Sequence, residues 1–149
     1  MDINDYIVLL PHGYPIKMID KVLELNEKIS KTSCIIKMTN PFLEKDNSLS
    51  EMAYIELIAQ TSAIFLIYQR YANKGYTMDD LLKIKEEGGS LGFLVSITML
   101  KIFSSISVSD EVEVLVTLTD VMDDYYGFKA NIIHEKKIIS SGELSIYAE

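Results

Sequence analysis

The sequence predicts an α+β fold in which a curled antiparallel sheet wraps one long buried helix. Three observations predict it. Two β-rich runs lie near the start, a later stretch is apolar on nearly every helical face, and four further β-rich segments follow it. Runs of strands around a single helix are typical of an antiparallel sheet with the helix packed against one face. We expect residues 1–149 to form one domain.

The first third of the chain is expected to contain a short helix and a hairpin. Asp2–Leu10 predicts the helix, which Pro11 ends. Ile16–Leu25 and Ile29–Met38 predict two strands joined by a short turn, because both runs are rich in β-branched residues and alternate between apolar and polar positions. The single cysteine, Cys34, lies in the second run, so we expect it to be a buried structural thiol.

The central helix is predicted to run from about Ser50 to Asn73. Ser48–Glu51 has the pattern of a capping box, and Gly75 fits a C-terminal stop. Met52–Leu66 is apolar almost all the way round the helix. A helix of this kind in a water-soluble protein is buried on most sides.

The second half of the chain predicts a short helix followed by strands. Thr77–Glu87 is the expected helix, and the expected strands are Leu91–Ile102, Glu111–Met122, Tyr125–His134 and Lys137–Tyr147. Leu91–Ile102 is apolar on both faces and nearly free of charge. Such an edge strand is normally covered or paired. We therefore expect it to pair with a second copy of the chain, giving a homodimer or a higher oligomer.

Composition excludes several classes of function. The formal net charge of −8 argues against attraction to nucleic acid or to an anionic membrane surface. Glu56 and Gln60 interrupt the most apolar stretch, which argues against a membrane span. No Cys/His cluster or Gly-rich phosphate loop is present, so no metal is expected. One cysteine and the absence of a basic leader in Met1–Tyr6 favour a cytoplasmic location.

Three motifs carry a resemblance to a known family. Leu9–Val22 resembles the "LLPHRYPfLLVDRV" opening of β-hydroxyacyl-[acyl-carrier-protein] dehydratases of the FabZ type. Ile55–Gln60 resembles their "iEamAQ" signature, and Ser107–Val112 stands at the place of their "v.PGD.l" segment. Order and spacing agree from about residue 7 to the end. The resemblance implies a hot-dog fold and an acyl thioester substrate carried on phosphopantetheine, as part of acyl carrier protein or coenzyme A.

The loop before the helix departs from the family pattern. The FabZ-type enzymes carry "GHFP" there, and its His is their catalytic base. Asn40–Ser50 retains only an Asn-Pro-Phe and contains no His. In this the chain is most similar to a dehydratase-like hot-dog subgroup, associated with aryl-polyene and related lipid clusters, that also lacks the loop His. Gly13 also replaces the usual Arg.

Dehydration of a 3-hydroxyacyl thioester needs a base, an acid and donors for the thioester carbonyl. Glu56 is the candidate acid, because removal from water inside an apolar helix favours its protonated form. His12 is the candidate base, and the expected substrate contacts are Pro11, Phe42 and Gln60. The amides at Ser48–Met52 are candidate donors to the carbonyl. No cofactor is expected, because the thioester itself acidifies the α-proton.

Other roles for these residues stay open. Glu56 could instead bond to backbone in the core or face a dimer partner. His12 could have a purely structural role, holding its turn by hydrogen bonds to the backbone. Gln60 could orient the carboxylate of Glu56, or it could be a polar residue packed between the helix and its dimer mate. We expect Glu56 and His12 to face one cavity, and His134 to be a solvated turn residue. Alternative functions are a hot-dog thioesterase that uses Glu56 as base or nucleophile, and a non-catalytic acyl-binding or scaffold protein. The missing loop His favours the last of these, and Glu56 opposes it.

Overall fold

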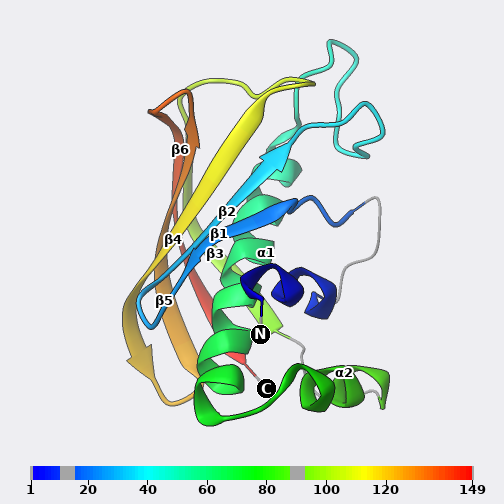
Figure 1. The fold of residues 1–149 in the computed structure, drawn as a ribbon. Coiled ribbons are helices and arrows are strands. Elements are labelled where there is room, and N and C mark those ends of the chain that lie inside the picture. Colours follow the sequence, from blue (N-terminus) through cyan, green and yellow to red (C-terminus); the bar gives the residue numbers. More distant parts are fainter. Residues whose placement is uncertain (1, 11–15, 88–92, 149) are drawn as a thin grey trace.

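A six-stranded antiparallel sheet curls around one long helix in the computed structural model, which describes residues 2–10, 16–87 and 93–148 (Figure 1). In chain order the elements are η1 (Ile3–Leu9), β1 (Lys21–Leu25), β2 (Ile29–Ile35), α1 (Glu51–Arg70), η2 (Ala72–Lys74), α2 (Met78–Glu86), β3 (Phe93–Ile102), β4 (Glu111–Met122), β5 (Tyr125–His134) and β6 (Lys137–Ala148). The predicted α+β class, with one long helix against an antiparallel sheet, is confirmed.

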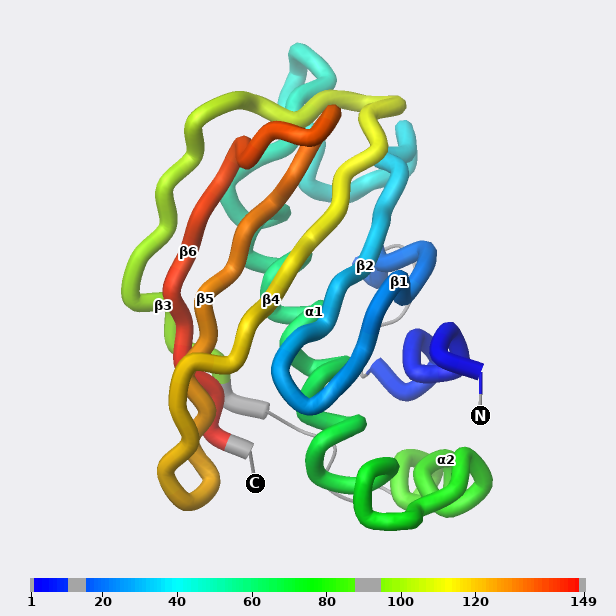
Figure 2. Tube along the Cα trace, turned by 60° about the vertical axis from the view of Figure 1, so that its left-hand side comes forward, coloured from blue at the N-terminus to red at the C-terminus, as the bar shows by residue number. Residues whose placement is uncertain are grey.

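The strand order in the sheet is β1-β2-β4-β5-β6-β3, and every neighbouring pair is antiparallel. β1 and β3 therefore form the two edges (Figure 2). Register shifts interrupt four of the five pairings, including one between Ile97 and Met99 of β3. Bulges of this kind increase the local twist of a strand, which helps the sheet to curl around the helix.

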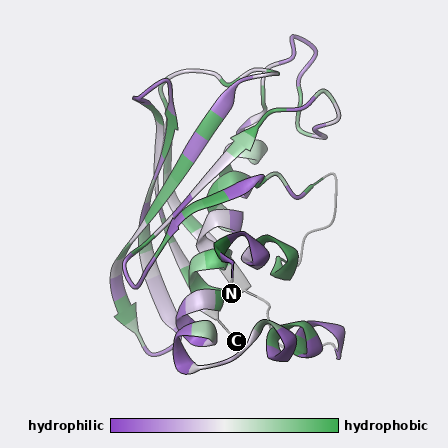
Figure 3. Ribbon diagram, in the orientation of Figure 1, coloured by the Kyte–Doolittle hydropathy of each residue, from purple (hydrophilic) through white to green (hydrophobic). Residues whose placement is uncertain are grey.

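The face of the sheet that contacts α1 is apolar. Val112, Val114 and Val116 of β4 are fully buried and alternate with less buried residues. Figure 3, which colours residues by hydropathy, shows apolar and polar bands along this strand. The ring of Phe128 on β5 meets Phe65 of α1 edge to face, with 5.4 Å between the ring centroids. The period of two that predicted the strands is thus the pattern that buries them against the helix.

The C-terminal half of α1 forms the centre of the core, with residues 61–67 all buried. Its hydroxyl side chains are satisfied within the helix. Thr61 Oγ1 donates to Leu57 O and Ser62 Oγ donates to Ile58 O, both at 2.8 Å. No described helix, α1 included, combines the length and apolarity that crossing a lipid bilayer requires.

Two strands are shorter than the sequence predicts. β1 begins at Lys21 rather than Ile16, and β2 ends at Ile35 rather than Met38. In the segment before β1, Ile16 O and Met18 N bond to the side chain of Gln60 on α1, and Asp20 N donates to Ser33 O of β2 at 2.9 Å. The β-branched composition of that segment did not reveal that Gln60 would be its partner.

The ends of α1 also differ from the prediction. Ser50 is the N-cap residue, but its side chain makes no capping hydrogen bond. The Ser48 hydroxyl donates to Asp46 instead, so the predicted capping box is not formed. The helix ends at Arg70, and a short 3-10 turn leads to Gly75, whose φ of 93° is left-handed. The predicted stop at Gly75 therefore ends the 3-10 turn rather than α1 itself.

α2 lies beside η1 at the C-terminal end of α1, as Figures 1 and 2 both show. Thr77 and Asp80 form a reciprocal capping box at its start. Leu81 is its one fully buried side chain among the described residues. The short helix predicted over Thr77–Glu87 is confirmed with bounds of Met78–Glu86.

Replacing Phe65 by alanine should destabilise the fold strongly, because Phe65 is fully buried against Phe128. Truncation of a buried phenylalanine costs about 3–5 kcal/mol. The matched control is Phe103→Ala, since Phe103 is 60% exposed, and its effect should stay within about 0.5 kcal/mol. Urea unfolding followed by circular dichroism measures both. Equal losses would contradict the assignment of the Phe65–Phe128 contact to the core.

Candidate functional site

Glu56 lies on the least covered face of α1. Met52 is 54% exposed, and Ile55, Glu56 and Ala59 are half-buried, whereas the opposite side of the helix is buried. Helix residues three or four positions apart share a face, so these four residues form one stripe. Glu56 is the only ionisable side chain of this stripe.

Gln60 is fully buried, and its amide is bonded entirely within the protein. Its Oε1 accepts a hydrogen bond from Met18 N at 2.9 Å. Its Nε2 donates to Ile16 O at 3.0 Å and to Glu56 Oε2 at 3.3 Å. A primary amide has two N–H donors, so both are occupied. Of the roles that the sequence left open for Gln60, the geometry favours orienting the carboxylate of Glu56.

The loop before α1 is joined to the same segment. Asn40 Nδ2 donates to Met18 Sδ at 3.2 Å, and Asn40 Oδ1 accepts from Phe42 N at 2.9 Å. Phe42 O accepts from Ser50 N, at the start of α1, at 2.8 Å. Phe42, an expected substrate contact, is half-buried at this junction. Sequence reasoning missed Asn40, although an Asn that bonds its own backbone two residues on is a known turn signal.

Only part of the N-terminus of α1 is available to a ligand. The amides of Ser48, Leu49 and Ser50 donate to other oxygens of the chain. Within the part of the chain that the structure describes, the amides of Glu51 and Met52 donate to none. The first amides of a helix have no partner inside the helix, so the predicted donors for a thioester carbonyl narrow to these two.

Two predicted site residues, Pro11 and His12, lie outside the described residues, so the expectation that His12 and Glu56 face one cavity stays a prediction. The residues on either side of them are held by helices. Leu10 O accepts from Lys85 Nζ of α2 at 3.0 Å. Ile16 O accepts a hydrogen bond from Gln60 Nε2 of α1 at 3.0 Å. The residues that flank segment 11–15, Leu10 and Ile16, are therefore each held by a hydrogen bond to a helix.

Two other titratable side chains lie apart from this group. His134, predicted to be a solvated turn residue, is the last residue of β5; its side chain is partly exposed, at 24%, and its Nδ1 lies 3.0 Å from Glu111 O. Cys34 is buried as predicted, and burial, helped by the negative charge of Asp20, raises the pKa of its thiol to about 12. Among the described residues, no group of three or more acidic, histidine or cysteine side chains could hold a metal ion.

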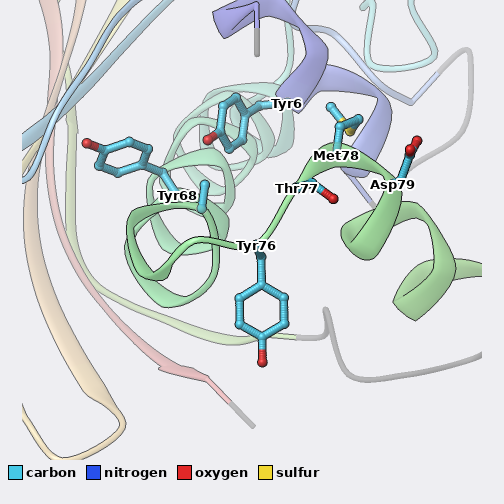
Figure 4. Close-up of a pocket in the computed structure, with 7 residues that line it drawn as sticks. Tyr6, Tyr68, Tyr76, Thr77, Met78 and Asp79 are labelled. Carbon is cyan, nitrogen blue, oxygen red and sulfur yellow. The ribbon is translucent and has the colours of Figure 1, made fainter.

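A pocket of about 500 Å³ lies at the far end of α1 (Figure 4). Its wall includes Tyr6 of η1, Tyr68 of α1, and Tyr76 with the first residues of α2. The rings of Tyr6 and Tyr68 meet edge to face with centroids 6.3 Å apart. Tyr68 follows Glu56 by twelve residues, which is about 18 Å along a helix. The tyrosine-lined pocket is therefore separate from the site around Glu56.

A family model described as "ApeP-like: ApeP dehydratase" matches residues 4–149. The chain belongs to this ApeP-like dehydratase family. The 3-hydroxyacyl-[acyl-carrier-protein] dehydratase FabZ of Polynucleobacter necessarius subsp. necessarius is 35% identical over 69 residues, which are 43% of this chain and 46% of that protein. FabZ of Oceanobacillus iheyensis is 24% identical over 123 residues, 79% of this chain and 77% of that protein.

Solved structures support the fold of this ApeP-like protein. The dehydratase heterocomplex ApeI:P from Xenorhabdus doucetiae matches with a TM-score of 0.69 and 16% identity, covering 100% of this chain and 91% of that one. Zebra fish thioesterase superfamily member 2 matches with a TM-score of 0.70 and 9% identity, covering 97% and 93%. At these identities the likeness concerns the fold alone, and the predicted hot-dog fold is confirmed.

Replacing Gln60 by leucine should destabilise the protein, because the buried Met18 N and the partly buried Ile16 O would lose their partner. An unpaired buried polar group costs about 1–3 kcal/mol. Gln69→Leu is the matched control on the same helix, since Gln69 Oε1 accepts no hydrogen bond among the described residues. Thermal unfolding measures both variants. An equal or larger loss for Gln69→Leu would contradict the role of Gln60 as the tie between α1 and segment 16–18.

Proposed function

We propose that this protein is a 3-hydroxyacyl-thioester dehydratase, acting on an acyl group carried by acyl carrier protein or coenzyme A in a fatty-acid or polyene type of biosynthesis. The observation that carries the proposal is the placement of Glu56. In a chain of a dehydratase family, this carboxylate is hydrogen-bonded by a buried amide on the one half-open stripe of the central helix.

The proposed reaction removes water from a 3-hydroxyacyl thioester to give the 2-enoyl thioester. His12 takes the proton from the α-carbon, and the electrons of that C–H bond form the new double bond as the C3–O bond breaks. Glu56 gives a proton to the leaving hydroxyl, which departs as water. General acid–base groups of this kind contribute about 10²–10⁴ each to rate.

The amides of Glu51 and Met52 are the proposed donors to the thioester carbonyl. Negative charge develops on that oxygen as the α-proton leaves, and donors fixed at a helix N-terminus stabilise it. Pro11 and Phe42 are the proposed contacts to the acyl group. Gln60 is assigned to positioning Glu56, because both of its N–H groups are bonded within the chain.

Replacing Glu56 by glutamine should reduce dehydration, or hydration of the enoyl thioester in reverse, by about 10²–10⁴. The substitution keeps the shape of the side chain and removes its titratable proton. Glu24→Gln on β1, where the side chain is exposed, is the control and should retain full activity. Spectrophotometry of the enoyl thioester follows turnover, and circular dichroism checks the fold.

Other outcomes of this assay decide between the remaining functions. Release of free thiol by the wild-type protein, lost in Glu56→Gln, would replace the dehydratase by a thioesterase. Binding of acyl thioesters without any chemical change would favour the non-catalytic acyl-binding function, which the absence of a histidine in Asn40–Ser50 also supports.

A homodimer through β3 is proposed as the working assembly. β3 lies at an edge of the sheet, with β6 as its one neighbour among the described strands. Met52, Ile55 and Ala59 leave an apolar stripe beside Glu56 that a second copy would cover. An isologous pairing of two β3 strands consumes both edges without forming a fibre.

Sedimentation at micromolar concentration should give twice the 16.9 kDa mass of the chain. Met52→Lys should produce monomers, because each copy would then carry a lysine charge into the apolar stripe that the two copies cover. Leu23→Lys on the other edge strand, where Leu23 is 43% exposed, should remain dimeric. A wild-type monomer would overturn the homodimer and favour pairing with a different hot-dog subunit, as in the ApeI:P heterocomplex named above.

A further inference from the structure

The tyrosine-lined pocket contains a buried side chain whose polar group has no partner. Tyr6 of η1 is only 5% exposed, and its hydroxyl makes no hydrogen bond to any group of the described residues. A buried hydroxyl of this kind normally bonds to water or to a ligand. The oxygen is not one of the wholly enclosed polar atoms of the described structure. The place for its partner is therefore the pocket of about 500 Å³ that Tyr6 lines.

Two aromatic rings dominate the wall of this pocket. Tyr6 and Tyr68 meet edge to face, a contact that covers at most one ring face, so each ring can still present a face to the pocket. The ring of Tyr76 points away from these two (Figure 4) and meets Tyr71 instead, with centroids 5.4 Å apart. Ring faces carry partial negative charge, which attracts cations.

The charges around the pocket also favour a cation. Its described lining contains one ionisable acid, Asp79, and no lysine, arginine or histidine. Asp79 is exposed and forms no ion pair within the described residues. α1 ends at Arg70, between Tyr68 and Ala72 of the pocket wall, and the C-terminal end of a helix carries partial negative charge. Arg70 itself is paired with Asp124 at 3.1 Å.

The start of α2 acts in the opposite direction, because the N-terminal end of a helix carries partial positive charge. Two acidic residues in its first turn, Asp79 and Asp80, offset this charge. Asp80 is held in the capping box, where it accepts from Thr77 N at 2.9 Å. The carboxylate of Asp79 is thus left to face a ligand, and the net charge of −8 on the chain adds to the attraction for cations.

We infer that the tyrosine-lined pocket binds an organic ammonium ion with an apolar body, whose positive charge lies against the rings of Tyr6 and Tyr68 and near the carboxylate of Asp79. The Tyr6 hydroxyl bonds to a polar group of the ligand. Burial raises the pKa of Tyr6, and its nearness to Tyr68 raises it further, so this hydroxyl stays protonated and both donates and accepts. The inference does not depend on the proposed dehydratase activity.

The test uses three small molecules of similar shape and different charge. Choline carries a trimethylammonium group, 3,3-dimethylbutanol is its uncharged carbon analogue, and 3,3-dimethylbutanoate is an anion. Titration of the whole chain at millimolar ligand concentrations, followed by NMR, should show choline binding about three- to thirtyfold more tightly than the uncharged analogue, the range expected for cation–π contacts. Choline should also raise the Tm, because a ligand of the folded state stabilises it.

Asp79→Asn and Tyr68→Leu should each remove most of the preference for choline, whereas Tyr68→Phe, which keeps the ring, should retain it. Asp123→Asn is the matched control. It removes the same charge from an exposed turn between β4 and β5, where the φ of 54° suits asparagine as well as aspartate. This variant should keep the full preference.

Equal binding of choline and its uncharged analogue would overturn the inference and leave only an apolar pocket. Tighter binding of the carboxylate would also overturn it and assign the pocket to anions at the start of α2. An equal loss in Asp79→Asn and Asp123→Asn would attribute the effect to the overall charge of the chain rather than to this pocket. Absence of any choline binding by the wild-type protein would reject the site outright.

Discussion

The buried amide of Gln60 is the constraint on which the arrangement of the site depends. A primary amide inside an apolar helix has to find hydrogen-bond partners, because each unpaired buried polar group costs about 1–3 kcal/mol. Here the partners are Ile16 O, Met18 N and Glu56. These bonds fix the segment before β1 against α1 and hold the carboxylate in one orientation. They also occupy main-chain groups of Ile16 and Met18, and β1 begins only at Lys21.

The two halves of α1 differ in burial. Residues 61–67 are buried under the sheet and supply the packing that holds the fold together. The preceding turns leave Met52, Ile55, Glu56 and Ala59 partly uncovered. The proposed chemistry at the uncovered stripe is therefore carried by an element that the core makes rigid, and side chains on a rigid helix keep their geometry better than side chains on a loop.

Patterns with a short period could be predicted from the sequence, and contacts between distant segments could not. Glu111–Met122 and Tyr125–His134 have the predicted bounds, because alternation is a local signal. Glu56 and Gln60 stood out because they are polar in an apolar helix. Their partners did not, since Gln60 and Met18 lie 42 residues apart.

The errors have the same origin. The contact that partly covers His134 was not predicted because its partner, Glu111 O, belongs to a neighbouring strand 23 residues away. The capping box failed because the Ser48 hydroxyl had a nearer acceptor in its own loop. The link from Asn40 to Met18 also joins separate segments, so local composition carried only the turn signal of Asn40.

The pairing of β3 with β6 sets an order for folding during synthesis. Phe93 pairs with Ala148 and Ile102 with Ser140, so β3 leaves the ribosome before the described strand that flanks it exists. Until β6 has been synthesised, β3 has neither of its edges hydrogen-bonded to a described strand, although it carries only one charged residue, Lys101. Contacts that join distant parts of a chain form late, and exposed strand edges in the meantime invite association between nascent chains. Completion of β6 is thus the step after which β3 changes from an aggregation-prone segment into a paired edge strand of the sheet.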